Sequence, residues 1–241
     1  MTTVIDGDSI IYICHWDAVF KTFVKPKDLI FESINKMISS IIIETKCKEY
    51  HGFLGVGRGF RKKEFLDYKS NRKPIEIPYI NECKEFMKEE WGFELLTEFE
   101  PDDAVSILKH RYPEYTIAAI DKDILNNIEG RHYNYKTREW VSTNKTNAER
   151  HFWSQVITGD TADGIKGLPG AGEKAWLKIM DEYYVTRRKF HEIVLDKYIH
   201  HYGEYEGVKN FYKNYILLKM LVEQPEFVPQ PTKVDYNKLV I

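Results

Sequence analysis

The sequence predicts an α/β fold, in which a mostly parallel central sheet is flanked by helices and is followed by a helical C-terminal half. Two observations lead to this prediction. Short apolar runs typical of strands alternate with segments of helical periodicity over residues 1–143. From about residue 144 to residue 224 the pattern is almost wholly helical. Strands that alternate with helices pair in parallel, because each helix returns the chain to the starting edge of the sheet.

Each expected element has its own local signal. Strands are short, rich in branched and aromatic residues, and end at polar residues or glycine. The expected strands comprise residues 2–5, 50–56, 93–97 and 115–120, with a hairpin of residues 131–135 and 139–142. The expected helices comprise residues 28–45, 78–91, a segment that Pro101 opens, and residues 173–184. The expected organisation is therefore a core of residues 1–143, a helical region of residues 144–224 and an extended tail of residues 225–241.

Composition and cysteine spacing exclude several classes of protein. The chain has 241 residues, of which 43% are hydrophobic and 30% charged, as in an ordinary globular protein. No apolar run approaches the roughly 20 residues that a membrane span needs. Three cysteines without CxxC spacing favour neither a disulfide framework nor a zinc site. With no signal-peptide character at the N-terminus, we expect a cytoplasmic protein without a membrane partner.

The net charge of −2 hides an uneven distribution. Residues 57–73 hold seven basic residues and two acidic ones, whereas aspartates gather in short motifs elsewhere. Such a run is often no more than a solvated face, and this remains the alternative. A basic patch beside an acidic pocket is typical of a metal-dependent enzyme that acts on nucleic acid.

Acidic residues follow the predicted strands. They form four groups: Asp6 with Asp8, Glu100 with Asp102 and Asp103, Asp121 with Asp123, and Asp160 with Asp163. We expect the last pair to share a face of a helical turn, because its members are three residues apart. Each group alone is explained as well by turns and helix caps. Together they predict one pocket beyond the carboxyl ends of the strands.

A pocket of carboxylates needs cations. Two unit charges about 4 Å apart repel by roughly 4 kcal/mol at an effective dielectric of 20. Protons or divalent ions must therefore compensate the charge. Oxygen-only ligands suit Mg²⁺, or Mn²⁺ as a substitute, and not zinc. A pair of such ions is the usual apparatus for displacement at phosphorus, so we expect two ions in the site.

A glycine-rich turn follows Asp163. It reads Gly167-Leu168-Pro169-Gly170-Ala171-Gly172 and leads into a helix. Glycines let a backbone approach a ligand closely, and amides at a helix start can receive phosphate oxygens. Three lysines nearby add positive charge: Lys166, Lys174 and Lys178. The alternative is that the turn is only a loop.

These motifs together resemble those of the 5′-nuclease (flap endonuclease-like) superfamily, most of all the short 5′→3′ exonucleases of T7-type phages. The matching segments occur in family order and span roughly residues 1–185. They are Asp6-Gly7-Asp8, Tyr68-Lys69-Ser70-Asn71-Arg72-Lys73, Glu100-Pro101-Asp102-Asp103, Asp121-Lys122-Asp123, and Gly159-Asp160-Thr161-Ala162-Asp163 with the glycine turn. The resemblance implies a PIN/5′-nuclease-like core with an arch over residues 57–92 and a helix-hairpin-helix DNA-binding motif.

The resemblance also implies roles for individual residues. Asp6, Glu100, Asp102 and Asp103 would serve the first metal ion, and Asp121, Asp123, Asp160 and Asp163 the second. Lys69 and Arg72 would lie on a helix at the base of the arch and stabilise charge on the scissile phosphate. We therefore expect four catalytic residues: Lys69, Arg72, Asp121 and Asp123. Tyr68 would stack on an unpaired base, with a half-buried tyrosine as the alternative. The remaining expected DNA contacts are Arg58, Arg61, Lys62, Lys166, Gly167, Gly170, Gly172, Lys174 and Lys178.

One departure from the family concerns the end of the second strand. Family members usually carry a metal-binding aspartate there, and Val56 takes its place in Leu54-Gly55-Val56-Gly57. Weak binding at the first metal position, compensation by Asp8 and impaired catalysis all remain open. The segment between Val56 and Glu100 is also short, which favours a small arch.

The function that we expect is metal-dependent hydrolysis of phosphodiester bonds at 5′ ends or branches of duplex DNA. RNA–DNA hybrid is a further expected substrate, a K⁺ ion at the hairpin is implied by the resemblance, and we expect a monomer acting in phage DNA replication or degradation. Two alternatives stay open. One is a DNA-binding protein that keeps the scaffold but has lost cleavage, and the other is a haloacid-dehalogenase-like phosphatase with Asp6 as the nucleophile.

Overall fold

A computed structural model describes residues 1–16, 22, 25–57, 59–72 and 76–240. The chain divides into two compact units, each built from separate stretches of sequence. The α/β unit comprises Met1–Gly59, Ile75–Asn144 and Met220–Ile241. The helical unit comprises Phe60–Pro74 and Lys145–Lys219. One division between the units thus falls after Asn144, while the described residues 60–72 belong to the helical unit and the C-terminal residues to the α/β unit.

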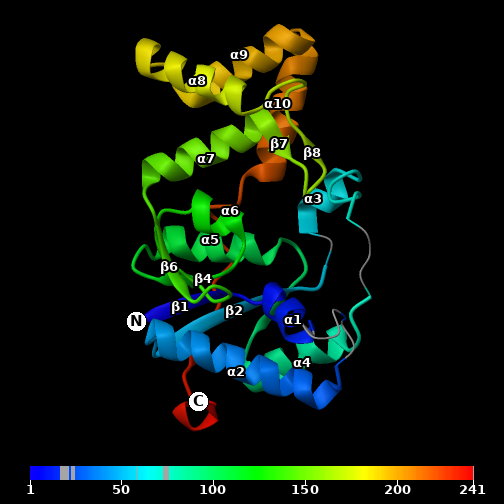
Figure 1. The fold of residues 1–241 in the computed structure, drawn as a ribbon, viewed down its shortest axis with the longest axis vertical. Coiled ribbons are helices and arrows are strands. Elements are labelled where there is room, and N and C mark those ends of the chain that lie inside the picture. Colours follow the sequence, from blue (N-terminus) through cyan, green and yellow to red (C-terminus); the bar gives the residue numbers. More distant parts are fainter. Residues whose placement is uncertain (17–21, 23–24, 58, 73–75, 241) are drawn as a thin grey trace. The chain divides into compact units, whose positions relative to one another are not determined.

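The α/β unit is built on a central sheet with the strand order β3-β2-β1-β4-β5-β6 (Figure 1). Neighbouring strands from β3 to β5 are parallel, whereas β6 and the C-terminal β9 pair antiparallel to β5 and β2. The strands are β1 (Thr2–Asp6), β2 (Glu49–Gly55), β3 (Glu94–Leu96), β4 (Thr116–Ala118), β5 (Gly130–Asn134), β6 (Glu139–Thr143) and β9 (Thr232–Lys233). This confirms the mostly parallel sheet predicted from the alternation of strands and helices.

Helices cover both faces of this sheet because its strands are apolar on both faces. Ile5 and Leu54 point into one buried cluster with α1 (Asp8–His15), α2 (Lys27–Thr45) and α4 (Ile80–Trp91). Val4 and Phe53 point into the opposite cluster with α5 (Pro101–Arg111). The short α6 (Lys122–Asn127) follows β4. Alternate residues of a strand face opposite sides, so both sides are closed to water.

The helical unit has its own core. It contains α7 (Lys145–Thr158), the strands β7 (Gly159–Asp160) and β8 (Ile165–Lys166), α8 (Glu173–Thr186), α9 (Phe190–Tyr202) and α10 (Glu204–Leu218). Trp153, Ile193, Tyr198 and Phe211 lie at the centre of its main apolar cluster. Most of α3 (Gly59–Glu64) also belongs to this unit. Every helix in the described ranges is too short or too polar to span a membrane.

Two local expectations about this unit are wrong. Asp160 and Asp163 do not share a helical turn, because β7 and β8 form an antiparallel pair and Asp160 lies in β7. Lys69 and Arg72 do not lie on a helix either, since α3 ends at Glu64 and turns follow it. Lys69 has a φ of 56°, a left-handed conformation that cannot continue a right-handed helix.

Candidate functional site

The carboxyl edge of the sheet gathers acidic residues in the α/β unit, as predicted. Asp6 ends β1, Asp8 opens α1, and Asp121 is the N-cap of α6 directly after β4. Parallel pairing fixes their proximity, because β1 lies between β2 and β4 with Ile5 opposite Ala118. The ends of these strands therefore meet at one edge.

Asp6 is the most constrained of these acids. Its side chain is only 6% exposed. Burial, followed by the charges of Asp8 and Asp121, raises the pKa of Asp6 to about 8. The phenol of Tyr135 donates a 2.9 Å hydrogen bond to the Asp6 carbonyl oxygen and fixes the backbone there. A carboxylate held in this way among like charges favours a proton or a metal cation beside it.

Asp8 reaches the end of the neighbouring strand. Its Oδ1 accepts a 3.0 Å hydrogen bond from the Gly55 amide, at the last residue of β2. The next residue is Val56, whose side chain is 44% exposed and whose amide donates to the Leu96 carbonyl oxygen. The position at which family members usually carry an aspartate is thus accessible to solvent, and the Asp8 carboxylate lies beside the end of β2.

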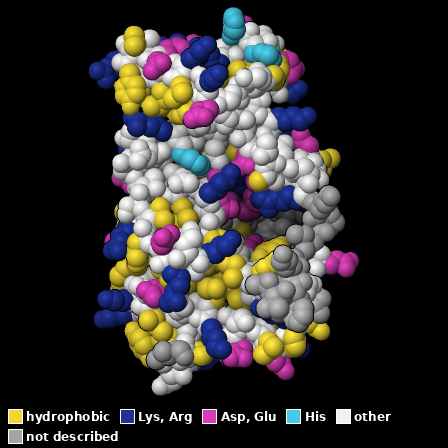
Figure 2. Space-filling view, in the orientation of Figure 1, with side chains coloured by type: hydrophobic (Ala, Val, Ile, Leu, Met, Phe, Trp, Pro, Cys, Tyr) yellow, Lys and Arg dark blue, Asp and Glu magenta, His cyan; other side chains and the backbone are white. Residues whose placement is uncertain are grey.

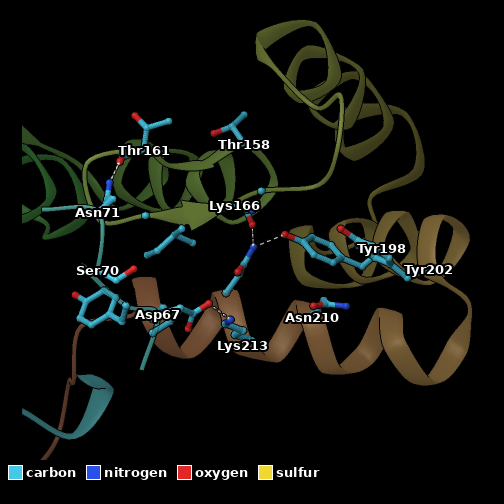
Figure 3. A pocket seen from close by; sticks show the side chains of 16 residues that line it. Asp67, Ser70, Asn71, Thr158, Thr161, Lys166, Tyr198, Tyr202, Asn210 and Lys213 are labelled. Atoms are coloured by element: carbon cyan, nitrogen blue, oxygen red, sulfur yellow. Dashed lines mark hydrogen bonds and ion pairs between the residues drawn. The ribbon is translucent and has the colours of Figure 1, made fainter. Parts of the chain in front are cut away.

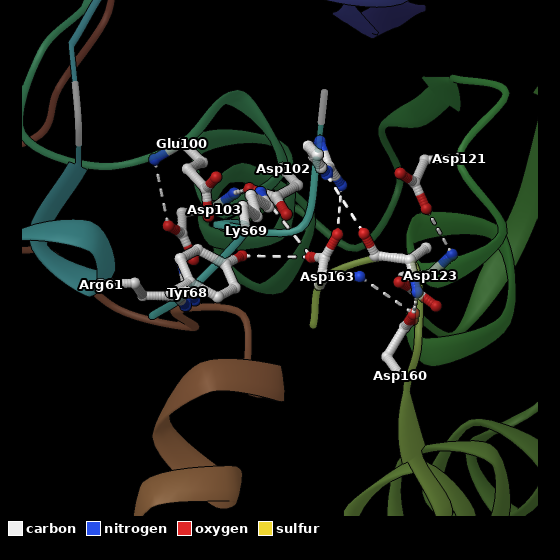
Figure 4. A network of polar contacts seen from close by, with 12 residues as sticks. Arg61, Tyr68, Lys69, Glu100, Asp102, Asp103, Asp121, Asp123, Asp160 and Asp163 are labelled. Atoms are coloured by element: carbon white, nitrogen blue, oxygen red, sulfur yellow. Dashed lines mark hydrogen bonds and ion pairs between the residues drawn. The ribbon is translucent and has the colours of Figure 1, made fainter. Parts of the chain in front are cut away.

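The acids of α5 differ in burial and in hydrogen bonding. Asp103 is fully buried and accepts hydrogen bonds from the amides of Leu221 (2.8 Å) and Glu100 (3.2 Å). Asp102 accepts a 2.8 Å bond from the Asp103 amide and is only partly buried (Figure 4). Each Asp103 oxygen accepts one of these backbone amides, and a carboxylate oxygen has two lone pairs, so this geometry is compatible with the expected metal-ligand role.

Asp121 and Asp123 form a compact cap at the start of α6. The Asp121 Oδ1 accepts a 2.7 Å hydrogen bond from the Asp123 amide, which leaves the other oxygen of Asp121 outward (Figure 4). Asp121 is exposed and Asp123 partly buried. Both interpretations of this motif, as a helix cap and as a pair of metal ligands, are therefore compatible with this geometry.

The helical unit holds a second group, in which cations surround Asp163. Arg72 forms an ion pair with its Oδ1, the Lys69 Nζ lies 3.8 Å from its Oδ2, and the Tyr68 phenol donates to that oxygen at 3.3 Å (Figure 4). The Lys69 amide also donates to the Asp163 carbonyl oxygen at 2.9 Å. Asp160 is buried and accepts from the Ala162 amide at 2.8 Å. The sequence showed that these residues belong to two motifs of the family, but it did not predict that they form this ion-pair cluster.

The structure corrects two expected DNA contacts and leaves a third outside its range. Tyr68 is only 4% exposed and packs with Ile165 and Leu217, so its ring cannot stack on a base. Arg61 is 2% exposed, because its guanidinium caps the C-terminal carbonyl oxygens of α10 at Ile216 and Lys219. Arg58 lies outside the described residues. Lys62 is exposed, as a phosphate contact requires.

The three glycines of the turn before α8 have different reasons to be glycine. A Cβ on Gly167 would lie 2.2 Å from the Thr158 carbonyl carbon, so close chain packing requires glycine there. Gly170 has a φ of 73°, which favours glycine. A Cβ on Gly172 would meet nothing within 4 Å, and its φ is an ordinary −121°. Nothing inside the chain requires glycine at residue 172, which fits a ligand approaching from outside.

Three exposed lysines lie near this turn, together with the exposed Glu173 at the start of α8. Lys166 of β8 and Lys174 and Lys178 of α8 are all exposed. On the face shown in Figure 2, lysines and arginines are spread among acidic side chains and do not form one continuous block.

The carboxylates suit a hard divalent cation by chemistry. Their donors are all oxygen, and the pKa of Asp6 is raised first by burial and then by the charges of Asp8 and Asp121. Within the described ranges, however, no three His, Cys, Asp or Glu side chains are already grouped so that they could hold a metal ion.

Comparisons with known proteins identify the fold. The D15 protein of phage T5, crystallised with metal ions, superposes with a TM-score of 0.64 at 18% identity, covering 90% of this chain and 88% of that one. The D15 flap endonuclease in complex with DNA and metal ions gives the same values. The catalytic core of Rad2 with a DNA substrate gives a TM-score of 0.53 at 14% identity, covering 76% of this chain and 61% of that one.

A sequence relative agrees with these structures. DNA polymerase I of Caldicellulosiruptor bescii is 24% identical over 210 residues, a match that covers 75% of this chain. The match spans only 24% of the polymerase. No protein-family profile matches the chain. The resemblance predicted from the motifs is thus confirmed for the fold, which is that of the 5′-nucleases, and the phosphatase alternative loses its support.

Proposed function

We propose that this chain is a divalent-metal-dependent 5′-nuclease that hydrolyses phosphodiester bonds at 5′ ends or branch points of duplex DNA. The observation that carries the proposal is Asp6, a buried carboxylate at the end of the central strand with its pKa raised to about 8 beside Asp8 and Asp121. A fold shared with nucleases crystallised with DNA supports the same reaction. No structural requirement of the sheet itself explains such a concentration of charge.

The ligands that we assign to the metal ions are those expected from the sequence. Asp6, Glu100, Asp102 and Asp103 would hold the first ion, and the Asp103 carboxylate also accepts the Glu100 amide. Asp121, Asp123, Asp160 and Asp163 remain the proposed ligands of the second. When bound, Mg²⁺ or Mn²⁺ would polarise the scissile phosphate and increase the acidity of a bound water.

Lys69 and Arg72 are the proposed catalytic cations. In the free chain both lie against Asp163, which keeps their charges at one place. With Asp163 serving as a metal ligand, the two side chains would be available to a phosphate. A fixed pair of cations at the developing charge lowers the barrier to displacement. Tyr68 then contributes by supporting Asp163 from the apolar core, not by stacking.

Duplex binding is assigned to the turn before α8. The amides around Gly170 and Gly172, with Lys166, Lys174 and Lys178, would contact phosphates, and Lys62 would add to them. A K⁺ ion at this turn, activity on RNA–DNA hybrid, a monomeric state and a role in phage DNA replication or degradation in the cytoplasm of a host belong to the same proposal. None of these features is needed for the central reaction.

A cleavage assay tests the proposal. Labelled blunt, nicked and 5′-flapped duplexes and an RNA–DNA hybrid are incubated with Mg²⁺, with Mn²⁺ and with EDTA. We expect cleavage with either metal and none with EDTA. Asp121→Asn should abolish cleavage, whereas Asp181→Asn, which changes an exposed acid of α8, should not. Binding of duplex ends in Ca²⁺ without any cleavage in Mg²⁺ would instead identify a DNA-binding protein that no longer cuts.

A further inference from the structure

A cavity of about 650 Å³ lies within the helical unit and shares only Tyr68 and Lys166 with the function proposed above (Figure 3). Its wall is formed by the turn after α3, the β7–β8 hairpin, the C-terminal end of α9 and the C-terminal half of α10. The residues that decide its chemistry are Asp67, Lys166, Tyr202, Asn210, Lys213 and Asn214. Cavities of about 300–1,000 Å³ are the usual size of small-ligand sites.

The wall is fixed by buried hydrogen bonds. Asn214 is 5% exposed, and its Nδ2 donates to the Lys166 carbonyl oxygen (2.7 Å) and to the Tyr198 phenol oxygen (2.8 Å). Tyr198 in turn donates to the Val156 carbonyl oxygen at 2.6 Å. In Figure 3 dashed lines run from Lys166 and from Tyr198 to one side-chain amide between them, so the two Asn214 contacts join β8, α10 and α9. The cavity is therefore preformed, which lowers the entropy cost of binding.

The charge in the cavity favours an anion. The Lys213 Nζ pairs with Asp67 at 2.7 Å, and the charge of Lys166 also lowers the pKa of Asp67. Two lysines thus face one carboxylate, which disfavours a metal cation as the occupant. The Asp67 side chain is 67% exposed, so an incoming phosphate can replace it at Lys213 with little loss, because exposed ion pairs are weak. The Asn210 amide adds a further polar group on the same helix face.

The rest of the lining is apolar or aromatic. Ile165, Leu217 and the Tyr68 ring form one buried cluster that reaches the cavity. The Tyr202 ring stands at the rim and is 38% exposed. A planar base can stack on such a ring irrespective of its sequence. Inorganic phosphate alone would leave these surfaces unused.

We propose that this cavity binds a nucleoside monophosphate group, with its phosphate on Lys213 and Lys166 and its base against Tyr202. The group can be a free mononucleotide or one unpaired nucleotide of a strand, since both present the same chemistry. None of the acids assigned to the metal ions lines the cavity, whereas Lys166 is shared with the proposed duplex contact.

The test is calorimetric titration of the full chain with deoxyadenosine 5′-monophosphate in EDTA, where metal-dependent binding and cleavage are absent. Deoxyadenosine, inorganic phosphate and an oligothymidylate without terminal phosphate are titrated in parallel. We expect the mononucleotide to bind more tightly than either of its parts. Tighter binding of the oligonucleotide than of the mononucleotide would assign the group to a DNA strand, and the reverse would assign it to a free nucleotide.

Two variants of one ion pair make the test independent of folding. Lys213→Gln and Asp67→Asn break the same contact, yet we expect the first to weaken mononucleotide binding about tenfold and the second to tighten it about threefold. Tyr202→Leu should reduce mononucleotide binding without changing phosphate binding. Lys209→Gln, on α10 but paired with Glu206, is the matched control and should have no effect.

The proposal is overturned by any of three results. The first is the absence of mononucleotide binding to the unchanged protein at concentrations up to about 10 mM, because a weaker site would contribute too little binding free energy to be specific. The second is an equal effect of Lys213→Gln and Asp67→Asn in the same direction. The third is equal affinity for phosphate and mononucleotide, which would leave only an anion site.

Discussion

The Asp8 carboxylate accepts a 3.0 Å hydrogen bond from the Gly55 amide, and so an acid from α1 stands at the end of β2 beside Val56. Its second oxygen would lie 3.0 Å from a Cβ placed on Gly55, which shows how closely the two segments pack. The family aspartate expected after β2 is absent, but a carboxylate is present next to its place. Val56 itself is exposed, so an acid introduced at this position would not be buried.

Val56→Asp is therefore predicted to lower the Mg²⁺ concentration needed for half-maximal cleavage by several-fold. An added carboxylate next to Asp8 supplies a hard ligand in place of an apolar side chain. Because residue 56 is 44% exposed, the free energy of unfolding should change by no more than about 0.5 kcal/mol. The measurement is a Mg²⁺ titration with a thermal melt. Val56→Thr, similar in shape but uncharged, is the control and should leave the Mg²⁺ titration unchanged. An unchanged titration of Val56→Asp would contradict the hypothesis that the first metal site lacks a ligand at residue 56.

Asp6→Asn should separate stability from activity. At pH 9 in EDTA, Asp6 is ionised while buried beside Asp8 and Asp121, which opposes folding. Removing that charge should raise the free energy of unfolding by about 1–3 kcal/mol. The same change should abolish cleavage and the rise in melting temperature that Mg²⁺ gives the unchanged protein. A destabilised Asp6→Asn variant in EDTA would mean that the acids are not under mutual repulsion.

The positions of the elements were largely predictable from the sequence, whereas the roles of single side chains were not. Strand β1, the β5–β6 hairpin and helix α5 follow from periodicity and from Pro101, all of which are local signals. The burial of Arg61 and Tyr68 depends on α10 and β8, which are more than 90 residues away in the chain. A basic run gives no local sign that one of its members caps a distant helix.

His51 predicts how stability changes with pH. It lies buried in β2, where burial lowers its pKa from 6.5 to about 4 and its Nδ1 has no hydrogen-bond partner. Between these two values the unfolded chain binds the proton and the folded chain does not, so stability is full above pH 6.5 and falls as the pH drops towards 4. The slope from one proton is at most about 1.4 kcal/mol per pH unit.

Chemical denaturation between pH 4 and 7.5 measures this slope. His51→Phe should flatten it, because Phe fills the site between Phe53 and Tyr115 without a titrating group. His200→Gln changes an exposed histidine of α9 and should keep the original slope. An unchanged slope in His51→Phe would show that His51 is protonated equally in both states.

Lys69→Gly tests the catalytic cation without damaging the fold. Residue 69 has a φ of 56°, a conformation that glycine adopts without strain, so stability should be kept or slightly raised. Turnover at saturating DNA should fall by about 10²–10³, the usual loss for one missing donor at the transition state, and Arg72→Ala should do the same. Lys46→Gly is the control, because Lys46 has a φ of 51° at the end of α2. A similar loss in Lys46→Gly would trace the effect to backbone conformation rather than charge.

Gly172→Ala is predicted to weaken duplex binding in a protein that folds normally. Its Cβ would meet no atom of the chain within 4 Å, and its backbone conformation is open to alanine. If phosphates approach the α8 amides there, the added methyl group pushes them away and the slope of binding against salt concentration decreases.

Gly203→Ala, at a left-handed position with equally open surroundings between α9 and α10, should lower stability without changing duplex binding. Gly167→Ala should unfold the turn altogether, since its Cβ would overlap the α7 backbone. Normal duplex affinity in Gly172→Ala would assign the turn a structural role only, and Lys174→Ala would then be expected to bind normally as well.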